Sequence, residues 1–270
     1  MPSGTAIDSK QGNRCNLLPL STKRQAFSPL TVFCDFDGPI VDVSDRYYQT
    51  YQLGLAEVQA NYQATGITLP IHLLTKEQFW QMKQNRVPDV EIAMRSGLSG
   101  AEIDLFLRRV VQIVNQPTLL DQDYLQPGVR WALTMLHNQG ARLVLVTLRC
   151  QQQAIQILNS HGLLSMFSGI WGAQDQGVAY LNHTDHKTQL LTEAIASFGD
   201  IAPHTAWMVG DTEADVLAGQ ATDIPTIALT CGIRSQTYLK KFEPTRIHSD
   251  LLSAAHYLVY QGENLPLAVS

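Results

Sequence analysis

Four short apolar runs constrain the fold of this chain more than any other feature of its sequence. Each run is rich in Val, Ile or aromatic residues and does not alternate with polar residues, which is typical of strands covered on both faces. The runs therefore predict a parallel sheet buried between helices. They occupy residues 31–35, 142–147, 205–209 and 225–229.

Helical patterns fill the segments between these runs. Three of the patterns stop at a glycine, the residue that most often follows a helix C-terminus: Gly140, Gly162 and Gly199. Strands that alternate with helices across short turns predict an α/β fold with a Rossmann-like, doubly wound parallel sheet. The expected helices are 128–139, 151–161 and 187–198.

A mostly helical segment interrupts this alternation directly after the first strand. Residues at spacings of three and four form an apolar stripe, and Ser99 with Glu102 forms a capping box that opens another helix. We expect a core domain of residues 28–43 and 126–270, an all-helical cap domain of residues 44–125, and an N-terminal extension of residues 1–27 that is disordered. Hinges are expected at 43–45 and 126–128. The stripe consists of Tyr47, Tyr51, Leu55 and Val58.

Charge and apolar patterning exclude several classes of protein. The chain has 19 basic and 24 acidic residues, a formal net charge of -5, which argues against a basic nucleic-acid binder. No window approaches the about 18 consecutive apolar residues of a membrane span, and no apolar stretch resembles a signal peptide. We therefore expect neither a nucleic-acid nor a membrane partner.

The four cysteines, Cys15, Cys34, Cys150 and Cys231, show no CxxC spacing and are too few for a disulfide framework. We expect reduced thiols in a cytoplasmic protein. Cys34 and Cys150 lie in or beside apolar runs and are predicted to be small core residues.

Carboxylates follow two of the predicted strands. Asp35 and Asp37 flank the end of the first strand, whereas Asp211 and Asp215 follow the third. Ligands of open parallel sheets bind beyond the carboxyl ends of the strands. Acidic residues there can also form a simple turn or complement a helix dipole. Acids gathered at one edge would repel one another unless a cation neutralised them, and oxygen ligands of this kind suit Mg²⁺.

Two further polar residues stand at predicted element ends. Thr147 closes the second strand before a helix, where its hydroxyl and the following N–H can hold an anion. Lys187 begins a helix, where its ammonium can contact a phosphoryl oxygen or Asp35. Either residue on its own is more often structural.

These residues occur in an order that resembles the haloacid dehalogenase-like superfamily, in particular its members similar to phosphoglycolate phosphatase that carry a helical cap. The resemblance covers about residues 30–262 and includes the four family motifs: DFDG at 35–38, Thr147, Lys187, and GDTEAD at 210–215. It implies a Mg²⁺-dependent hydrolase acting on a small phosphorylated metabolite.

The resemblance also implies a role for each motif residue. Asp35 would attack the phosphorus and form an aspartyl-phosphate. Asp37 would act as acid and then as base. Mg²⁺ would be bound by the Asp35 carboxylate, the Asp37 carbonyl and Asp211. Asp215 would support the metal, either through a water molecule or by orienting Lys187. Thr147, the backbone N–H of Leu148, and Lys187 would bind the phosphoryl group.

The chain departs from the family pattern next to these motifs. Pro39 and Ile40 replace the usual Thr and Leu, and Leu148 replaces a frequent Asn or Gly. Arg149 either adds positive charge to the site or is a solvated residue at a helix start. None of the changes removes a charged catalytic group.

Three functional hypotheses remain at this point. The first is a phosphatase with an aspartyl-phosphate intermediate. The alternative is a phosphomutase of the β-phosphoglucomutase type, which would share every motif residue. The third is a phosphoacceptor or non-catalytic module, disfavoured because a scaffold has no need for four mutually repelling acids and a matching lysine.

Specificity is expected to come from the cap. Each candidate below is either a substrate contact or an ordinary surface or core residue, and the sequence names neither the substrate nor the oligomeric state. The basic candidates are Lys83, Arg86, Arg95 and Arg234, and the aromatic candidates are Tyr47 and Tyr48.

Overall fold

The computed structural model describes residues 30–174, 182–199, 201 and 205–263. The predicted N-terminal extension, residues 1–27, lies outside the described residues. No helix in the described ranges is long and apolar enough to cross a membrane.

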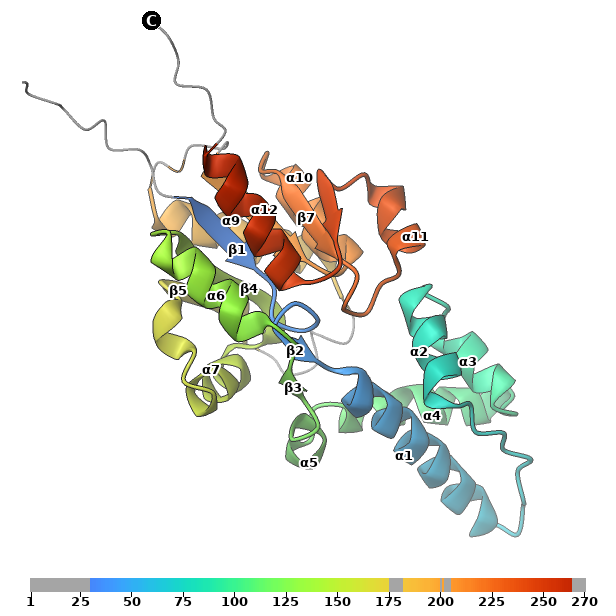
Figure 1. Cartoon of the computed structure of the whole chain (residues 1–270). Coiled ribbons are helices and arrows are strands. Elements are labelled where there is room, and N and C mark those ends of the chain that lie inside the picture. Colours follow the sequence, from blue (N-terminus) through green and yellow to red (C-terminus); the bar gives the residue numbers. More distant parts are fainter. Residues whose placement is uncertain (1–29, 175–181, 200, 202–204, 264–270) are drawn as a thin grey trace, which may run out of the picture.

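The core is a six-stranded sheet in which every neighbouring pair is parallel (Figure 1). The strand order is β5-β4-β1-β6-β7-β8, so the first strand lies inside the sheet, with β4 and β5 added on one side of it and β6, β7 and β8 on the other. The strands are β1 (Thr31–Cys34), β4 (Arg142–Cys150), β5 (Gly169–Ala173), β6 (Ala206–Gly210), β7 (Thr226–Leu229) and β8 (Arg246–His248).

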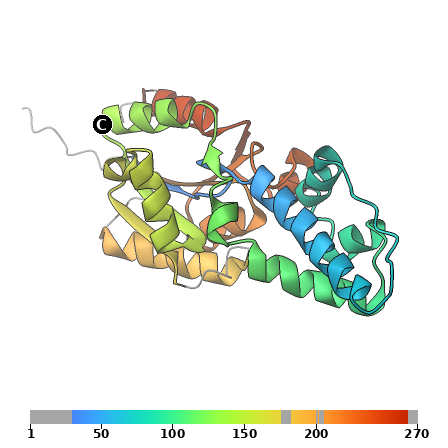
Figure 2. The same cartoon turned by 90° about the horizontal axis from the view of Figure 1, so that it is seen from below.

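Helices cover both faces of the sheet, which confirms the predicted doubly wound α/β fold (Figure 2). Val32 and Cys34 of β1 pack into the cluster that contains α6 and α12, whereas Phe33 packs into the opposite cluster with α9 and part of α10. This explains the continuous apolar runs, because successive side chains of a strand point to opposite faces. The helices are α6 (Val129–Asn138), α7 (Gln151–Ser160), α9 (Thr184–Ser197), α10 (Glu213–Ala221), α11 (Gln236–Leu239) and α12 (Leu251–Glu263), with short 3₁₀ turns η1 (Leu164–Met166) and η3 (Lys240–Phe242).

Five helices lie between β1 and β4 in sequence and form a separate group beside the sheet (Figure 1). We call residues 44–123 the helical insert. A two-stranded antiparallel ribbon, β2 (Val41–Asp42) with β3 (Tyr124–Leu125), carries the chain into and out of the insert. The insert helices are α1 (Ser44–Gln63), α2 (Lys76–Gln84), α3 (Asp89–Arg95), α4 (Gly100–Ile113) and α5 (Pro117–Leu120).

Local sequence signals account for the insert helices. The predicted stripe Tyr47, Tyr51, Leu55 and Val58 is the buried face of α1. Ser99 is the N-cap of α4, and its backbone N–H donates to the Glu102 carboxylate at 2.8 Å, which confirms the capping box.

Two predicted element ends were wrong. Strand β4 continues past Thr147 to Cys150, with a register shift between these residues, so Thr147 does not precede a helix directly. Helix α9 begins at Thr184, so Lys187 is the fourth helical residue and not the first. Its side chain is therefore carried by a formed helical turn.

Strands β5 and β8 and the ribbon were absent from the sequence expectations. β5 has the sequence GIWGA, and its glycines hide the apolar pattern. β8 is an edge strand of three residues that begins with the exposed Arg246. Two-residue strands such as β2 carry no periodicity.

Candidate active site

Three carboxylates meet where two neighbouring strands end. Asp35 follows β1, Asp211 follows β6, and Asp215 lies in the first turn of α10. Because β1 and β6 pair in parallel register and the Asp35 N–H donates to Val209 at 2.9 Å, the strand ends are adjacent. One carboxylate oxygen from each of the three residues lies within 4.8 Å of the others, and all three residues are buried.

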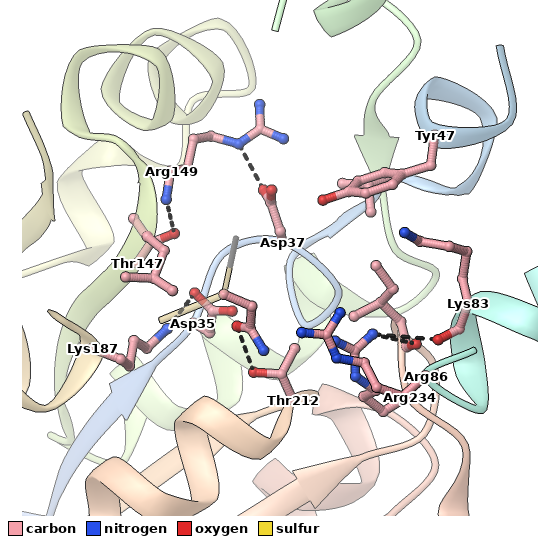
Figure 3. Close-up of a pocket in the computed structure, with 14 residues that line it drawn as sticks. Asp35, Asp37, Tyr47, Lys83, Arg86, Thr147, Arg149, Lys187, Thr212 and Arg234 are labelled. Atoms are coloured by element: carbon pink, nitrogen blue, oxygen red, sulfur yellow. Dashed lines mark hydrogen bonds and ion pairs between the residues drawn. The ribbon is translucent and has the colours of Figure 1, made fainter. Parts of the chain in front are cut away.

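Lys187 lies against this cluster. Its Nζ is 2.7 Å from Oδ1 of Asp35 and 2.7 Å from Oδ1 of Asp215 (Figure 3 shows the approach to Asp35). Burial alone would lower the pKa of Lys187, but the charges of Asp215 and Asp35 outweigh it and raise the pKa. Lys187 is therefore a permanent cation that links two of the acids.

Helix capping fixes the position of Asp215. Its Oδ2 accepts from the backbone N–H of Thr212 at 3.0 Å and from the Thr212 hydroxyl at 2.8 Å, as a capping box at the start of α10. Its other oxygen is left for Lys187. The acid predicted one helical turn after Asp211 thus binds and orients the lysine.

Burial sets the titration of the other two acids. It raises the pKa of Asp35 to about 7, with Lys187 opposing and Asp215 adding to the rise. Burial, followed by the charges of Asp35 and Asp215, also raises the pKa of Asp211 well above its usual value. In the absence of a cation, this site therefore disfavours full ionisation of its carboxylates.

The donor set fits a hard divalent cation. Asp211 Oδ2 accepts from the Ile233 N–H at 2.6 Å, whereas its buried Oδ1 has no hydrogen-bond partner. Two glycines leave room around this carboxylate, since a Cβ at Gly38 or Gly232 would lie 2.3 Å or 1.9 Å from its atoms. An unpartnered oxygen of Asp211 beside two further buried carboxylates suits Mg²⁺, which would also neutralise the repulsion among the three acids.

The side chain of Asp37 points to a different set of partners. Its Oδ1 lies 2.6 Å from Nε of Arg149, and its Oδ2 lies 3.1 Å from Nη2 of Arg46. Burial would raise the pKa of Asp37, but the charges of Arg149 and Arg46 outweigh it and lower the pKa. Among the predicted metal ligands, Asp37 is thus the one whose carboxylate lies outside the acidic cluster, and any metal contact would use its backbone carbonyl.

A pocket opens above these groups, between the sheet and the helical insert (Figure 3). It contains every predicted catalytic and substrate-binding residue. Its lining consists of Asp35, Asp37, Val43, Tyr47, Lys83, Arg86, Thr147, Leu148, Arg149, Asn182, Lys187, Thr212, Ile233 and Arg234.

Thr147 and Leu148 are among the residues that line this pocket. The Thr147 hydroxyl accepts from the Arg149 N–H at 3.1 Å, so the predicted role of a helix N-terminus is replaced by a local contact within the irregular end of β4. Arg149 itself is 2 % exposed. The solvated alternative for Arg149 is therefore wrong, and its charge belongs to the site.

The basic specificity candidates divide into two groups. Lys83, Arg86 and Arg234 line the pocket, whereas Arg95 pairs with Glu91 on an exposed face of α3. Lys83, from α2, is buried and lies 2.9 Å from the Asp89 carboxylate.

Arg86 and Arg234 meet at Glu213. They come from the insert and the core, respectively, and approach its carboxylate to 3.1 and 2.7 Å. Beside them, the Ser235 N–H donates to the Gln84 carbonyl at 2.9 Å. These contacts hold the end of α2 against the core.

The two aromatic candidates also separate. Tyr47 is buried and lines the pocket, so it serves both the α1 packing face and the site. Tyr48 is absent from the pocket lining, and its hydroxyl donates to the Leu74 carbonyl at 2.9 Å inside the insert.

The sequence reasoning missed Arg46, Asp123 and Glu213. Arg46 belongs to the first turn of α1, and its partner Asp123 lies 77 residues further along the chain. No local pattern marks such a pair. Arg46 stands on the same helical face as Thr50, four residues on, and only the structure shows that both are buried.

The profile of the haloacid dehalogenase-like hydrolases matches residues 32–229 of the chain, which reach from β1 to β7 and include the acidic cluster and Lys187, whereas Ile233 and Arg234 of the pocket lie beyond the match. The chain belongs to this family. It is therefore an enzyme of the hydrolase class, as the motif order indicated.

Relatives and solved structures agree with this assignment. The chain is 27% identical to the probable phosphatase IndB of Dickeya dadantii over 237 residues, which cover 86% of this chain and 95% of that protein. It is 28% identical to a phosphoglycolate phosphatase of Nitrosococcus oceani over 137 residues, 51% of this chain and 58% of that one.

The fold matches haloacid dehalogenase-like hydrolases of known structure. One from Streptococcus pneumoniae has a TM-score of 0.57 at 20% identity and covers 85% of this chain and 98% of its own. Another, from Geobacter sulfurreducens, has a TM-score of 0.58 at 20% identity, with coverages of 85% and 96%. At this identity the likeness concerns the fold alone.

Proposed function

We propose that this hydrolase is a Mg²⁺-dependent phosphatase that cleaves a small phosphomonoester through an aspartyl-phosphate on Asp35. The observation that carries the proposal is the buried cluster of Asp35, Asp211 and Asp215 with Lys187 against it, of which Asp35 and Lys187 line the pocket. The phosphatase names of relatives that match 86% and 51% of the chain support the reaction class.

Mg²⁺ would be held by the Asp35 carboxylate, the Asp37 carbonyl and Asp211, with Asp215 in support. When bound, it supplies positive charge that offsets the charge on the substrate phosphate. The unpartnered Oδ1 of Asp211 favours this assignment.

The first chemical step uses Asp35 and Asp37. A carboxylate oxygen of Asp35 forms a bond to phosphorus while the bond from phosphorus to the leaving oxygen breaks. The leaving oxygen keeps the electron pair and takes a proton from Asp37, so this step requires the protonated form of Asp37, although Arg149 and Arg46 lower its pKa in the free protein. Lys187 and Thr147 bind the phosphoryl oxygens and offset their charge, which is the main catalytic requirement of phosphoryl transfer.

The second step regenerates the enzyme. Asp37 accepts a proton from a water molecule whose oxygen attacks the phosphorus of the aspartyl-phosphate. The bond between phosphorus and the Asp35 oxygen then breaks, and inorganic phosphate leaves.

A pocket of this composition suits a small phosphorylated metabolite with a second anionic group. Lys83, Arg86 and Arg234 line the pocket on the side opposite Lys187 (Figure 3), so three cationic side chains approach the site there. The helical insert would act as the cap that closes over this substrate.

The mutase alternative gains no support from the relatives named above, which are phosphatases.

Free thiols at Cys34, Cys150 and Cys231, of which the first two are buried as predicted, support the proposal of a reducing, cytoplasmic location.

Phosphate release tests the proposed function. The purified protein is incubated with sugar phosphates, nucleotides, phosphoglycolate and phosphorylated amino acids, with Mg²⁺ or with EDTA. We expect release from at least one ester with Mg²⁺ alone, and none from the Asp35→Asn variant. Absence of release from the whole panel would refute the proposal, and isomerisation that requires a bisphosphate primer would favour the mutase.

A further inference from the structure

A closed ring of ion pairs surrounds the carboxylate of Asp37. Arg149 and Arg46 each contact one of its oxygens, at 2.6 and 3.1 Å. Asp123 completes the ring, with Oδ1 2.9 Å from Nε of Arg46 and Oδ2 in contact with Nη2 of Arg149. We call these four residues the Asp37 ring.

The ring joins the core to both connections of the helical insert. Asp37 lies in the turn after β1, and Arg149 lies near the end of β4 in the sheet. Arg46 is in the first turn of α1, where the chain enters the insert, and Asp123 directly precedes β3, where the chain leaves it. Any displacement of the insert relative to the sheet must therefore move half of the ring.

Burial makes these contacts obligatory. Arg46 is 1% exposed and Arg149 is 2% exposed, and the side chain of Asp123 is 1% exposed. Two arginines and two carboxylates balance in charge, and buried ions of this kind require close partners. Arg46 gains a further contact from Asn115 Oδ1 at 3.0 Å, which ties it to the end of α4.

Asp37 is the most exposed member of the ring, with 18% of its side chain accessible, and it faces the pocket. The buried members therefore form a rigid support behind one side chain that can reach a ligand. Catalytic groups depend on such support, because a small misplacement of a reacting group costs a large factor in rate.

We propose that Arg46 and Arg149, held together by Asp123, are positioning residues. They orient the carboxyl group of Asp37 toward the leaving oxygen, and they make this orientation depend on the position of the helical insert. This inference rests on the proposed phosphatase function. It assigns a role to three residues outside the four motifs, and it predicts that the ring matters in steps where Asp37 transfers a proton and not in the departure of a leaving group that needs none.

The dependence on the leaving group separates this role from a general structural one. An alkoxide leaving group needs the proton of Asp37 as its bond to phosphorus breaks, whereas p-nitrophenolate leaves as a stable anion without it. General acid catalysis contributes about 10²–10⁴-fold. A variant in which the Asp37 carboxyl group is no longer oriented toward the leaving oxygen should therefore release an alcohol far more slowly, with a much smaller effect on the release of p-nitrophenolate.

The experiment measures single-turnover release of the leaving group with enzyme in excess, which isolates the first step. Wild type is compared with Arg149→Gln, Arg46→Gln and Asp123→Asn, using p-nitrophenyl phosphate and an alkyl phosphate that the wild type accepts. Thermal unfolding checks the fold of each variant. The matched control is Arg95→Gln, which removes an arginine paired with Glu91 at 2.6 Å on an exposed face.

We expect the ring variants to lose about tenfold to a thousandfold in alcohol release, in line with the loss of general acid catalysis, and much less in p-nitrophenolate release. The Arg95→Gln control should match wild type on both substrates. In an Asp37→Asn background, adding Arg149→Gln should cause no further loss of alcohol release, because coupled residues are non-additive.

Equal losses on the two substrates, or a full further loss in the Asp37→Asn background, would overturn the inference. If Arg149→Gln fails to fold, Asp123→Asn, which keeps the side-chain shape and both arginines, and Arg46→Lys decide the question by the same comparison. A wild type that cleaves neither ester refutes the proposed function together with the ring, whereas an active wild type with equal losses refutes the ring alone.

Discussion

The metal-free protein should lose stability as the pH rises, because folding buries Asp35 among other acids. The unfolded pKa of Asp35 is 3.8, and burial raises its folded pKa to about 7. A folded pKa above the unfolded one means that this contribution to stability is fully present below pH 3.8 and is lost as the pH rises through about 7. The pKa of Asp211 is also raised, so Asp211 should lower the stability in the same way as the pH rises.

The size of the effect follows from the shift. A change from 3.8 to about 7 corresponds to roughly 4 kcal/mol in the free energy of unfolding, at about 1.4 kcal/mol per pH unit, of which roughly 2–3 kcal/mol falls between pH 5 and pH 8. Mg²⁺ should remove most of this loss, because it binds the ionised carboxylates. In the Asp35→Asn variant the side chain at position 35 is neutral at every pH, so this variant should be more stable than wild type at pH 8 in EDTA.

Urea unfolding in EDTA and in Mg²⁺, at pH 5 and pH 8, measures these differences. The difference in unfolding free energy between wild type and Asp35→Asn isolates Asp35 from the other titrating groups. We expect that difference to change by roughly 2–3 kcal/mol between the two pH values in EDTA. A difference that stays constant with pH, or Mg²⁺ stabilisation that is as large at pH 5 as at pH 8, would refute the reasoning.

Three further predictions concern single residues of the site. Lys187→Met removes the cation that contacts Asp35 and Asp215, and the rate of phosphate release should fall by about 10²–10³-fold or more, as measured by kcat on the best ester. Gly232→Ala places a Cβ about 1.9 Å from Oδ2 of Asp211, so the Mg²⁺ concentration for half-maximal activity should rise by about tenfold to a hundredfold; an unchanged Mg²⁺ requirement would argue against Asp211 as a ligand. Lys83→Met should raise KM by about tenfold for substrates with a second anionic group and leave KM unchanged for esters without one. An equal rise in KM for both kinds of substrate would contradict a role of Lys83 in substrate specificity.

The sequence was sufficient for those parts of the fold that depend on local pattern. The buried central strands were visible because helices cover both of their faces, so that every side chain in a run such as Val32–Cys34 is apolar. The stripe of α1 and the capping box of α4 were visible because each is a local pattern with a spacing of three or four residues. The edge strand β8 was not, because its exposed Arg246 and its length of three residues carry no pattern.

The acidic cluster could be predicted because topology alone brings the ends of adjacent parallel strands together. Asp35 and Asp211 needed no knowledge of the helical insert. The ion pairs around Asp37 could not be predicted, because Arg46 and Asp123 meet across 77 residues and only the folded insert brings them to the sheet. Arg149 was found as a candidate, yet its burial depended on the continuation of β4 to Cys150.

The most direct test of the central claim is to trap the covalent intermediate on Asp35. The Asp37→Asn variant, which lacks the base for the second step, is mixed with p-nitrophenyl phosphate and Mg²⁺, quenched in acid and digested for mass spectrometry. We predict that the peptide containing Asp35 carries one phosphoryl group, and that the same peptide of an Asp35→Asn, Asp37→Asn double variant carries none. Stoichiometric release of p-nitrophenolate without phosphorylation of that peptide would contradict the account.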